Sequence, residues 1–145
     1  MPIHDFPFTT QRGIARPMLW VRVSTPEGTK RTSPLLAKID TGADGCFFPA
    51  DIADELDYKL DPEESVEVVS SIGTGFAYPP HKSTIEVLEM SADGLAGKRL
   101  RSIPNVPIYF VEKGTQFLLR TKGFLNRCVL TVDYLNQVFS LALRE

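Results

Sequence analysis

The chain has 145 residues, of which 43% are hydrophobic and 23% are charged. This length is enough for one domain with a real hydrophobic core, and it excludes two domains of ordinary size. The formal net charge of -2 excludes the broad positive field that is typical of a nucleic-acid-binding protein. We therefore expect a single domain over residues 1–145 that binds no nucleic acid.

The sequence has no feature that directs it to a membrane or out of the cell. It contains no run of about 20 apolar residues, and its first residues lack the basic and then apolar regions of a signal peptide. Two cysteines, Cys46 and Cys128, fit free thiols in a reducing compartment. We expect a cytoplasmic protein. His4 and His81 lie in no C-x-x-C or H-x-x-x-H spacing, so we expect no metal site.

The first third of the chain predicts strands that lead to an acidic residue. Residues 1–16 contain two prolines and no sustained period, which predicts an irregular N-terminal arm or an edge segment. Residues 18–23 are rich in β-branched and aromatic side chains and predict a strand. After a turn at residues 26–29, residues 33–39 predict a second strand that ends at Asp40.

A short helix and a hairpin are expected next. Phe48, Ile52 and Leu56 are spaced four apart with acidic residues between them, which predicts one or two turns of amphipathic helix. Beyond a loop, residues 66–68 and 84–87 have strand character and flank small residues at 70–75. This pattern predicts a long hairpin with a mobile tip.

The last third of the chain again consists of short strand-like segments. A turn is expected at residues 92–97, strands at 106–111, 117–119, 130–134 and 139–143, and a second short helix at 123–127. Many short strands with one or two short helices predict an all-β fold that is closed or barrel-like.

The most informative stretch is Asp40-Thr41-Gly42-Ala43, which follows the apolar residues 35–37. It places a carboxylate on a tight turn at the end of a strand, in apolar surroundings. Such a position suits a carboxylate that shares a proton with a second carboxylate and activates water. An ordinary Asp-Gly turn is the alternative interpretation, but it requires neither the threonine nor the apolar strand.

With this motif and the segments around it, the chain resembles the retropepsin-like aspartic proteases. The resemblance begins at residues 37–45 and continues through Phe47-Phe48-Pro49 into the short helix. It resumes at residues 72–76, which look like the flap of that family, and ends with residues 124–127, 130–134 and the last strand. In all it covers roughly residues 17–143, in matching order.

The resemblance implies an aspartic endopeptidase with the closed, barrel-like retropepsin fold. The chain holds a single Asp-Thr-Gly, so a second Asp40 must come from a second chain, and a two-fold axis supplies it. The implied enzyme is a symmetric homodimer that hydrolyses extended peptides and needs no metal or organic cofactor. Its catalytic residues would be Asp40, Thr41 and Gly42.

The resemblance also implies which residues bind the substrate. Those of the active-site loop would meet the main chain of the peptide, and those of the flap would close over it as a neighbouring strand. These residues are Ala43, Asp44, Gly45, Ile72, Gly73, Thr74 and Gly75.

One segment departs from the family pattern. The family usually has two apolar residues and then Gly-Arg-Asp or Gly-Arg-Asn, whereas here Leu118-Leu119 are followed by Arg120-Thr121-Lys122-Gly123. One hypothesis is that Arg120 replaces the family arginine by pairing with Asp44. The departure favours an alternative function, a catalytically inactive retropepsin-fold module that binds peptides or mediates dimerisation.

Other reactive side chains are interpreted as structural. Cys46 lies near the proposed site but has no partner histidine in the sequence pattern, which favours a small buried hydrophobic residue over a nucleophile. Cys128 is expected in the core. His81 follows two prolines and is expected in an exposed loop. Lys38 lies on a strand expected to be buried, so its side chain should point outward.

Overall fold

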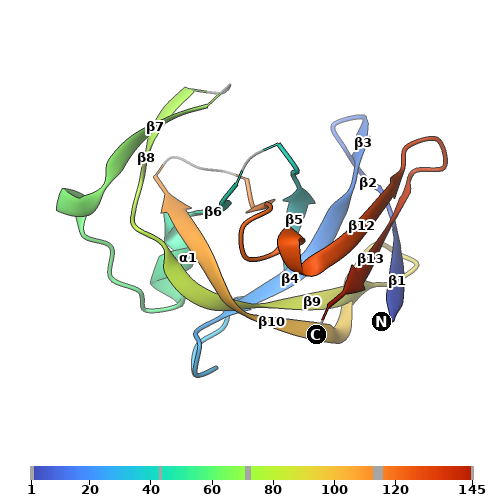
Figure 1. The fold of residues 1–145 in the computed structure, drawn as a ribbon, viewed down its shortest axis with the longest axis horizontal. Coiled ribbons are helices and arrows are strands. Elements are labelled where there is room, and N and C mark those ends of the chain that lie inside the picture. The colour runs from blue at the N-terminus through green and yellow to red at the C-terminus, as the bar shows by residue number, and fades with distance from the viewer. Residues whose placement is uncertain (1, 43, 71–72, 113–115, 145) are drawn as a thin grey trace.

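The computed structural model describes residues 2–42, 44–70, 73–112 and 116–144. Its framework is a closed barrel of six strands (Figure 1), which confirms the expected closed all-β fold. In spatial order the strands are β6 (Cys46–Pro49), β11 (Leu118–Leu119), β5 (Leu35–Ile39), β4 (Met18–Ser24), β9 (His81–Met90) and β10 (Ala96–Val111). Parallel pairing of β10 with β6 closes the barrel.

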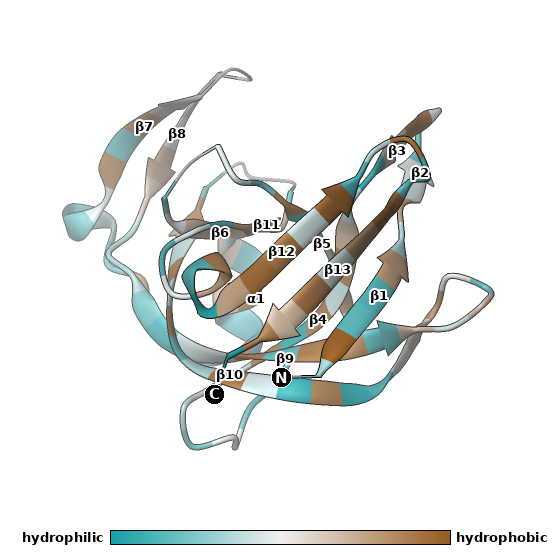
Figure 2. Ribbon diagram, turned by 45° about the vertical axis from the view of Figure 1, so that its right-hand side comes forward, coloured by the Kyte–Doolittle hydropathy of each residue, from teal (hydrophilic) through white to brown (hydrophobic). Residues whose placement is uncertain are grey.

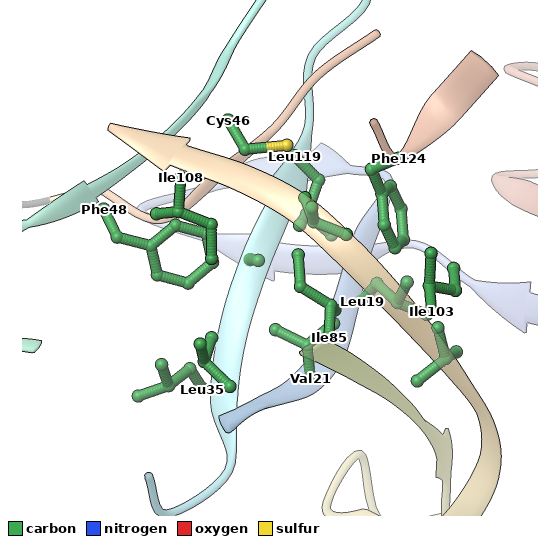
Figure 3. Close-up of a cluster of buried hydrophobic side chains, with 14 of the residues drawn as sticks. Leu19, Val21, Leu35, Cys46, Phe48, Ile85, Ile103, Ile108, Leu119 and Phe124 are labelled. Carbon is green, nitrogen blue, oxygen red and sulfur yellow. The ribbon is translucent and has the colours of Figure 1, made fainter. Parts of the chain in front are cut away.

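The barrel forms because its strands alternate between side chains that face its interior and side chains that face outward. In β5, Leu35, Ala37 and Ile39 are buried, whereas Leu36 and Lys38 are half-buried on the other face. The interior is filled by aliphatic and aromatic side chains from all six strands and from the segment after β11, many of them drawn in Figure 3. Lys38 therefore points away from the core, as predicted.

Strand β10 has 16 residues and pairs with three other strands. It runs antiparallel to β9 through several register shifts, then parallel to β6, and at its last residue it meets β8 (Gly73–Ala77). The predicted strand at residues 106–111 is only the second half of this strand. Residues 98–101, a basic cluster, lie in its first half.

The hairpin formed by β7 (Val66–Ser70) and β8 projects from the barrel (Figure 1). In the strand register, β8 pairs with β10 at one position, where Val111 lies opposite Ala77. The prediction that residues 66–68 and 84–87 form one long hairpin is wrong. Residues 84–87 belong to β9, which pairs with β4 and β10 in the barrel, because their buried side chains are covered there.

A second sheet joins the two ends of the chain. It contains β1 (Ile3–Pro7), β13 (Val138–Leu143) and β12 (Cys128–Asp133), in that order (Figure 2). The Phe6 ring stacks on the Phe139 ring with 5.1 Å between centroids. Of the two interpretations of residues 1–16, the edge segment is therefore confirmed by β1 and the irregular arm is wrong. The strands β2 (Thr9–Gln11) and β3 (Ile14–Arg16) form a further hairpin.

Three short helical segments complete the described chain. The predicted amphipathic helix is confirmed as α1 (Ala50–Glu55), with Pro49 as its N-cap. The loop expected between this helix and the hairpin contains a 3-10 turn, η1 (Pro62–Glu64). The second expected helix is a 3-10 turn, η2 (Leu125–Arg127). No helix within the described residues is long and apolar enough to cross a membrane.

His81 is not in an exposed loop, which corrects the prediction. It is the first residue of β9, and its ring stacks on Tyr58 with 4.7 Å between centroids. Two prolines at residues 79 and 80 end the preceding segment but do not prevent a strand from beginning immediately after them.

Candidate active site

Asp40 and Arg120 are brought together by the pairing of two parallel strands. Leu119 of β11 lies opposite Ile39 of β5, and the Asp40 N–H donates a hydrogen bond of 2.9 Å to the Leu119 carbonyl. Parallel strands in register place the residues that follow them at the same edge of the sheet. Arg120 therefore emerges beside Asp40, although the two are 80 positions apart in the sequence.

Both oxygens of the Asp40 carboxylate are hydrogen-bonded. Oδ1 accepts a bond of 3.1 Å from the backbone N–H of Gly42, which is the local contact that makes the Asp-Thr-Gly segment a tight turn. Oδ2 accepts a bond of 3.1 Å from Arg120 Nε. The side chains of Asp40 and Arg120 are 26% and 16% exposed. The ion pair is therefore partly shielded from solvent.

Arg120 is held in place by two further contacts. Its guanidinium carbon lies 4.8 Å from the centroid of the Phe47 ring, which is a cation–π geometry. Its backbone N–H lies 3.3 Å from Cys46 Sγ, and the thiol in turn points at the Arg120 carbonyl at 3.8 Å. Cys46 itself is buried in the core beside β11 (Figure 3), as expected from the sequence.

The surroundings shift the pKa values of Asp40 and Cys46 in opposite directions. Partial burial acts to raise the pKa of Asp40, but the hydrogen bonds from Gly42 and Arg120, with the positive charges of Arg120 and Lys38, outweigh it, so the pKa lies below its usual value. Burial raises the pKa of Cys46 to about 11, so its thiol stays neutral at pH 7. The absence of a thiolate is inconsistent with a nucleophilic role.

Arg120 does not pair with Asp44, so that hypothesis is wrong. The carboxylate that the guanidinium meets is Asp40. Asp44 is exposed, and its backbone carbonyl accepts a hydrogen bond of 2.6 Å from the Lys122 N–H. The next residue, Gly45, also bridges to Lys122. The loop after Asp40 is thus tied to the segment after β11 through backbone atoms.

A cleft of about 700 Å³ opens beside this loop. Residues of three parts of the chain line it. The first is the loop after Asp40 with β6, the second is the β7–β8 hairpin, and the third is β10 with residues 120–122. Apolar and aromatic side chains dominate the lining, including Phe47, Val66, Val68, Ala77 and Tyr109. Arg120 and the charged Asp44, Glu64 and Lys122 lie in the same lining. A cleft of this size and chemistry suits an apolar side chain of a ligand.

Gly45 is required where the loop enters β6. It is buried, and a Cβ built at this position would lie 2.7 Å from Tyr109 Cε2. The Tyr109 ring also packs against Phe47, with 5.5 Å between centroids. The absence of a side chain at Gly45 therefore lets the aromatic wall of the cleft approach the active-site loop.

The structure gathers some of the sequence-predicted site residues and leaves others apart. Asp40 and Gly42 contact each other, Thr41 is exposed, and Asp44 and Gly45 line the cleft. Gly73, Thr74 and Gly75 belong to β8. Ala43 and Ile72 fall outside the described residues.

Sequence reasoning missed the cleft walls and the partner of Asp40. In the sequence of β7, the apolar Val66 and Val68 are separated by the charged Glu67, a pattern that indicates one apolar face and could have identified the wall. No local pattern places Arg120 near Asp40 or Tyr109 in the cleft. Within the described residues, no group of three or more histidine, cysteine, aspartate or glutamate side chains could hold a metal ion.

Comparisons with known proteins place the fold. The chain matches no protein-family model and no curated protein sequence. A crystal structure of a retropepsin-like aspartic protease from Rickettsia conorii aligns with a TM-score of 0.52 and 10% identity, over 97% of this chain and 91% of that one. The EIAV protease complexed with the inhibitor HBY-793 aligns with a TM-score of 0.39 and 18% identity, over 77% and 88% of the two chains. The chain therefore has a retropepsin-like fold.

Proposed function

We propose that the protein is an aspartic endopeptidase that acts as a symmetric homodimer. The observation that carries the proposal is the position of Asp40: a carboxylate at the end of a barrel strand, on an Asp-Thr-Gly turn, and hydrogen-bonded to Arg120. Arg120 lines a largely apolar cleft together with Asp44 and Gly45 of the same loop. The retropepsin-like fold supports it, because a solved structure with a similar fold is a retropepsin-like aspartic protease.

The reaction requires two carboxylates that share one proton. The ionised carboxylate takes a proton from water, and the protonated one donates to the carbonyl oxygen of the scissile bond as the water oxygen attacks the carbonyl carbon. Two like charges this close do not both stay ionised at the pH of the reaction. Because the chain has one Asp-Thr-Gly, the second Asp40 comes from a second copy across a two-fold axis.

The other proposed roles follow from positions along the chain. Thr41 forms hydrogen bonds across the interface, and Gly42 fixes the carboxylate through its N–H and leaves room for substrate backbone. Asp44 and Gly45, with Ala43, meet the peptide main chain. The tip of the β7–β8 hairpin, residues 72–75, closes over the peptide as an added strand.

A second function is favoured by the ion pair of Asp40 with Arg120. An arginine beside the carboxylate stabilises its ionised form, whereas the reaction needs one proton on the pair. A retropepsin-fold module that binds peptides or mediates dimerisation, without hydrolysis, would tolerate this arrangement. The alternative shares the cleft and the homodimer but lacks turnover.

Cleavage of a diverse peptide mixture between about pH 4 and pH 7 separates the two functions. The parent is compared with Asp40→Asn and with Asp93→Asn, a matched control at an exposed Asp-Gly turn. We expect cleavage by the parent and by Asp93→Asn, and none by Asp40→Asn. If no protein cleaves and sedimentation shows a folded dimer, the binding module is favoured. Equal cleavage by all three would mean that Asp40 is not the catalytic group.

A further inference from the structure

We propose that Arg120 is a positioning residue for Asp40, which holds this carboxylate oriented and ionised so that the Asp40 pair takes up its shared proton only under acidic conditions. The proposal rests on the proposed function for its effect on catalysis. Its effect on Asp40 itself does not depend on catalysis and is measured separately below.

The backbone fixes the position of Arg120. The register of β11 with β5 places its Cα next to Asp40, and the Cys46 thiol contacts both its N–H and its carbonyl. The side chain therefore starts beside the carboxylate and does not have to reach it from elsewhere. An ion pair between groups that are already ordered loses less conformational entropy than one between two free surface side chains.

The surroundings of the Arg120 guanidinium direct it at Asp40. One face packs on the Phe47 ring at 4.8 Å, and Nε lies 3.1 Å from Oδ2. The Arg120 side chain is only 16% exposed and that of Asp40 26%. Partial removal from water strengthens the attraction of this pair relative to an exposed one. Asp40 therefore meets a cation that stays charged at every relevant pH.

The charged groups around Asp40 also favour its ionised form. The cations that act on it are Arg120, from the segment after β11, and more weakly Lys38, from its own strand. Two further charged residues lie nearby in sequence: Lys122 in the segment after β11, and Asp44 in the loop after β5. Backbone contacts join these two segments. From β6, Cys46 contributes a neutral thiol. Among these groups, the shortest contact with a full charge is the one to Arg120.

The consequence appears when two copies place their Asp40 side chains together. Mutual repulsion of the two carboxylates favours one shared proton, whereas two Arg120 side chains favour loss of that proton. The pair is the catalytic form only while it holds one proton. Arg120 therefore lowers the pH above which the proton is lost, and the alkaline limb of the activity profile moves to more acidic pH.

The test follows the titration of Asp40 and the pH profile in parallel. Carboxyl carbon NMR of the parent is compared with Arg120→Gln, with Arg120→Gly, which places at this position the glycine of the family pattern, and with Lys98→Gln, which removes an exposed charge on β10. Asp40→Asn identifies the resonance. The pH dependence of kcat/KM is measured on the same proteins.

We expect both Arg120 variants to raise the titration midpoint of Asp40 and the alkaline limb of kcat/KM by about one pH unit or more, and Lys98→Gln to change neither. An unchanged midpoint in a folded Arg120 variant would overturn the inference, whatever the activity. If no protein cleaves peptide but the midpoint rises, the role of Arg120 at Asp40 stands and the proposed protease function fails.

Discussion

Phe48 and Phe76 are both phenylalanines on strands, yet they lie in very different surroundings. Phe48 of β6 is fully buried in the barrel, whereas Phe76 of β8 leaves 47% of its surface exposed. The barrel closes on itself through β10 and β6. Among the described residues, the β7–β8 hairpin is joined to the barrel around the pair of Val111 with Ala77, and the hairpin projects from the barrel (Figure 1).

This difference separates two uses of apolar residues. In the barrel they remove surface from water and supply the free energy of folding. In the hairpin, Val66 and Val68 line the cleft and are at least partly exposed, so their apolar surface is available to a ligand. The barrel should therefore govern stability, and the hairpin should govern binding.

The largest effect should come from opening a cavity in the barrel. Phe48→Ala removes a fully buried ring and should lower the free energy of unfolding by about 3 to 5 kcal/mol. Urea unfolding followed by circular dichroism measures this. The conservative control Phe48→Leu should lose much less, and a loss below about 1 kcal/mol for the alanine variant would contradict the role assigned to the barrel core.

A second large effect is expected at Gly123, where the chain turns after β11. Its φ is +86°, and an added Cβ would lie 2.5 Å from Pro107 Cδ. Gly123→Ala should therefore cost about 1 to 3 kcal/mol from the backbone conformation and more from the contact. Gly28→Ala is the matched control, since Gly28 also has a positive φ, +77°, but has open space around it. Equal losses in urea unfolding would show that the contact with Pro107 has no effect.

The pH dependence of stability should depend on Asp40 and Arg120. The pKa of Asp40 is lowered in the folded state, so its contribution is present above the pKa of the unfolded chain and is lost as the pH falls through the folded value. Between about pH 5 and pH 2, the parent should lose more stability than Arg120→Gln, which lacks the partner. Urea titrations at several pH values test this. Identical pH dependence in the two proteins would exclude a stabilising ion pair.

The smallest effect should come from the hairpin. Phe76→Ala truncates a half-exposed side chain and should change the free energy of unfolding by less than about 0.5 kcal/mol. Phe110→Ala, at a fully buried ring of β10, is the control and should behave like Phe48→Ala in the same urea experiment. A large loss for Phe76→Ala would show that the hairpin belongs to the cooperative core.

Local patterns in the sequence predicted the features that depend on neighbouring residues. The four-residue spacing of Phe48, Ile52 and Leu56 predicted α1, and the apolar run before Asp40 predicted β5. Both succeed because helical and strand periodicity are set by residues close together in the chain.

Features that depend on distant residues could not be predicted in this way. Pro2 and Pro7 suggested an irregular segment, but Pro7 is the last residue of an edge strand, where a missing N–H is tolerated. The partner of Arg120 was misassigned because it depends on the parallel register of β11 with β5. That register joins segments about 80 residues apart, and no local signal encodes it.

The pairing of β1 with β13 affects the order in which the protein folds. Ser140 Oγ donates a hydrogen bond to Asp5 Oδ1, a contact between residues 135 positions apart. During synthesis, β1 leaves the ribosome long before its partner strand exists, so its Phe6 side chain, buried in the finished fold, has no place to pack. The barrel strands become available earlier, and contacts that close long loops tend to form late. We expect β1 to dock last, which makes this strand the segment most exposed to chaperones and to aggregation on the nascent chain.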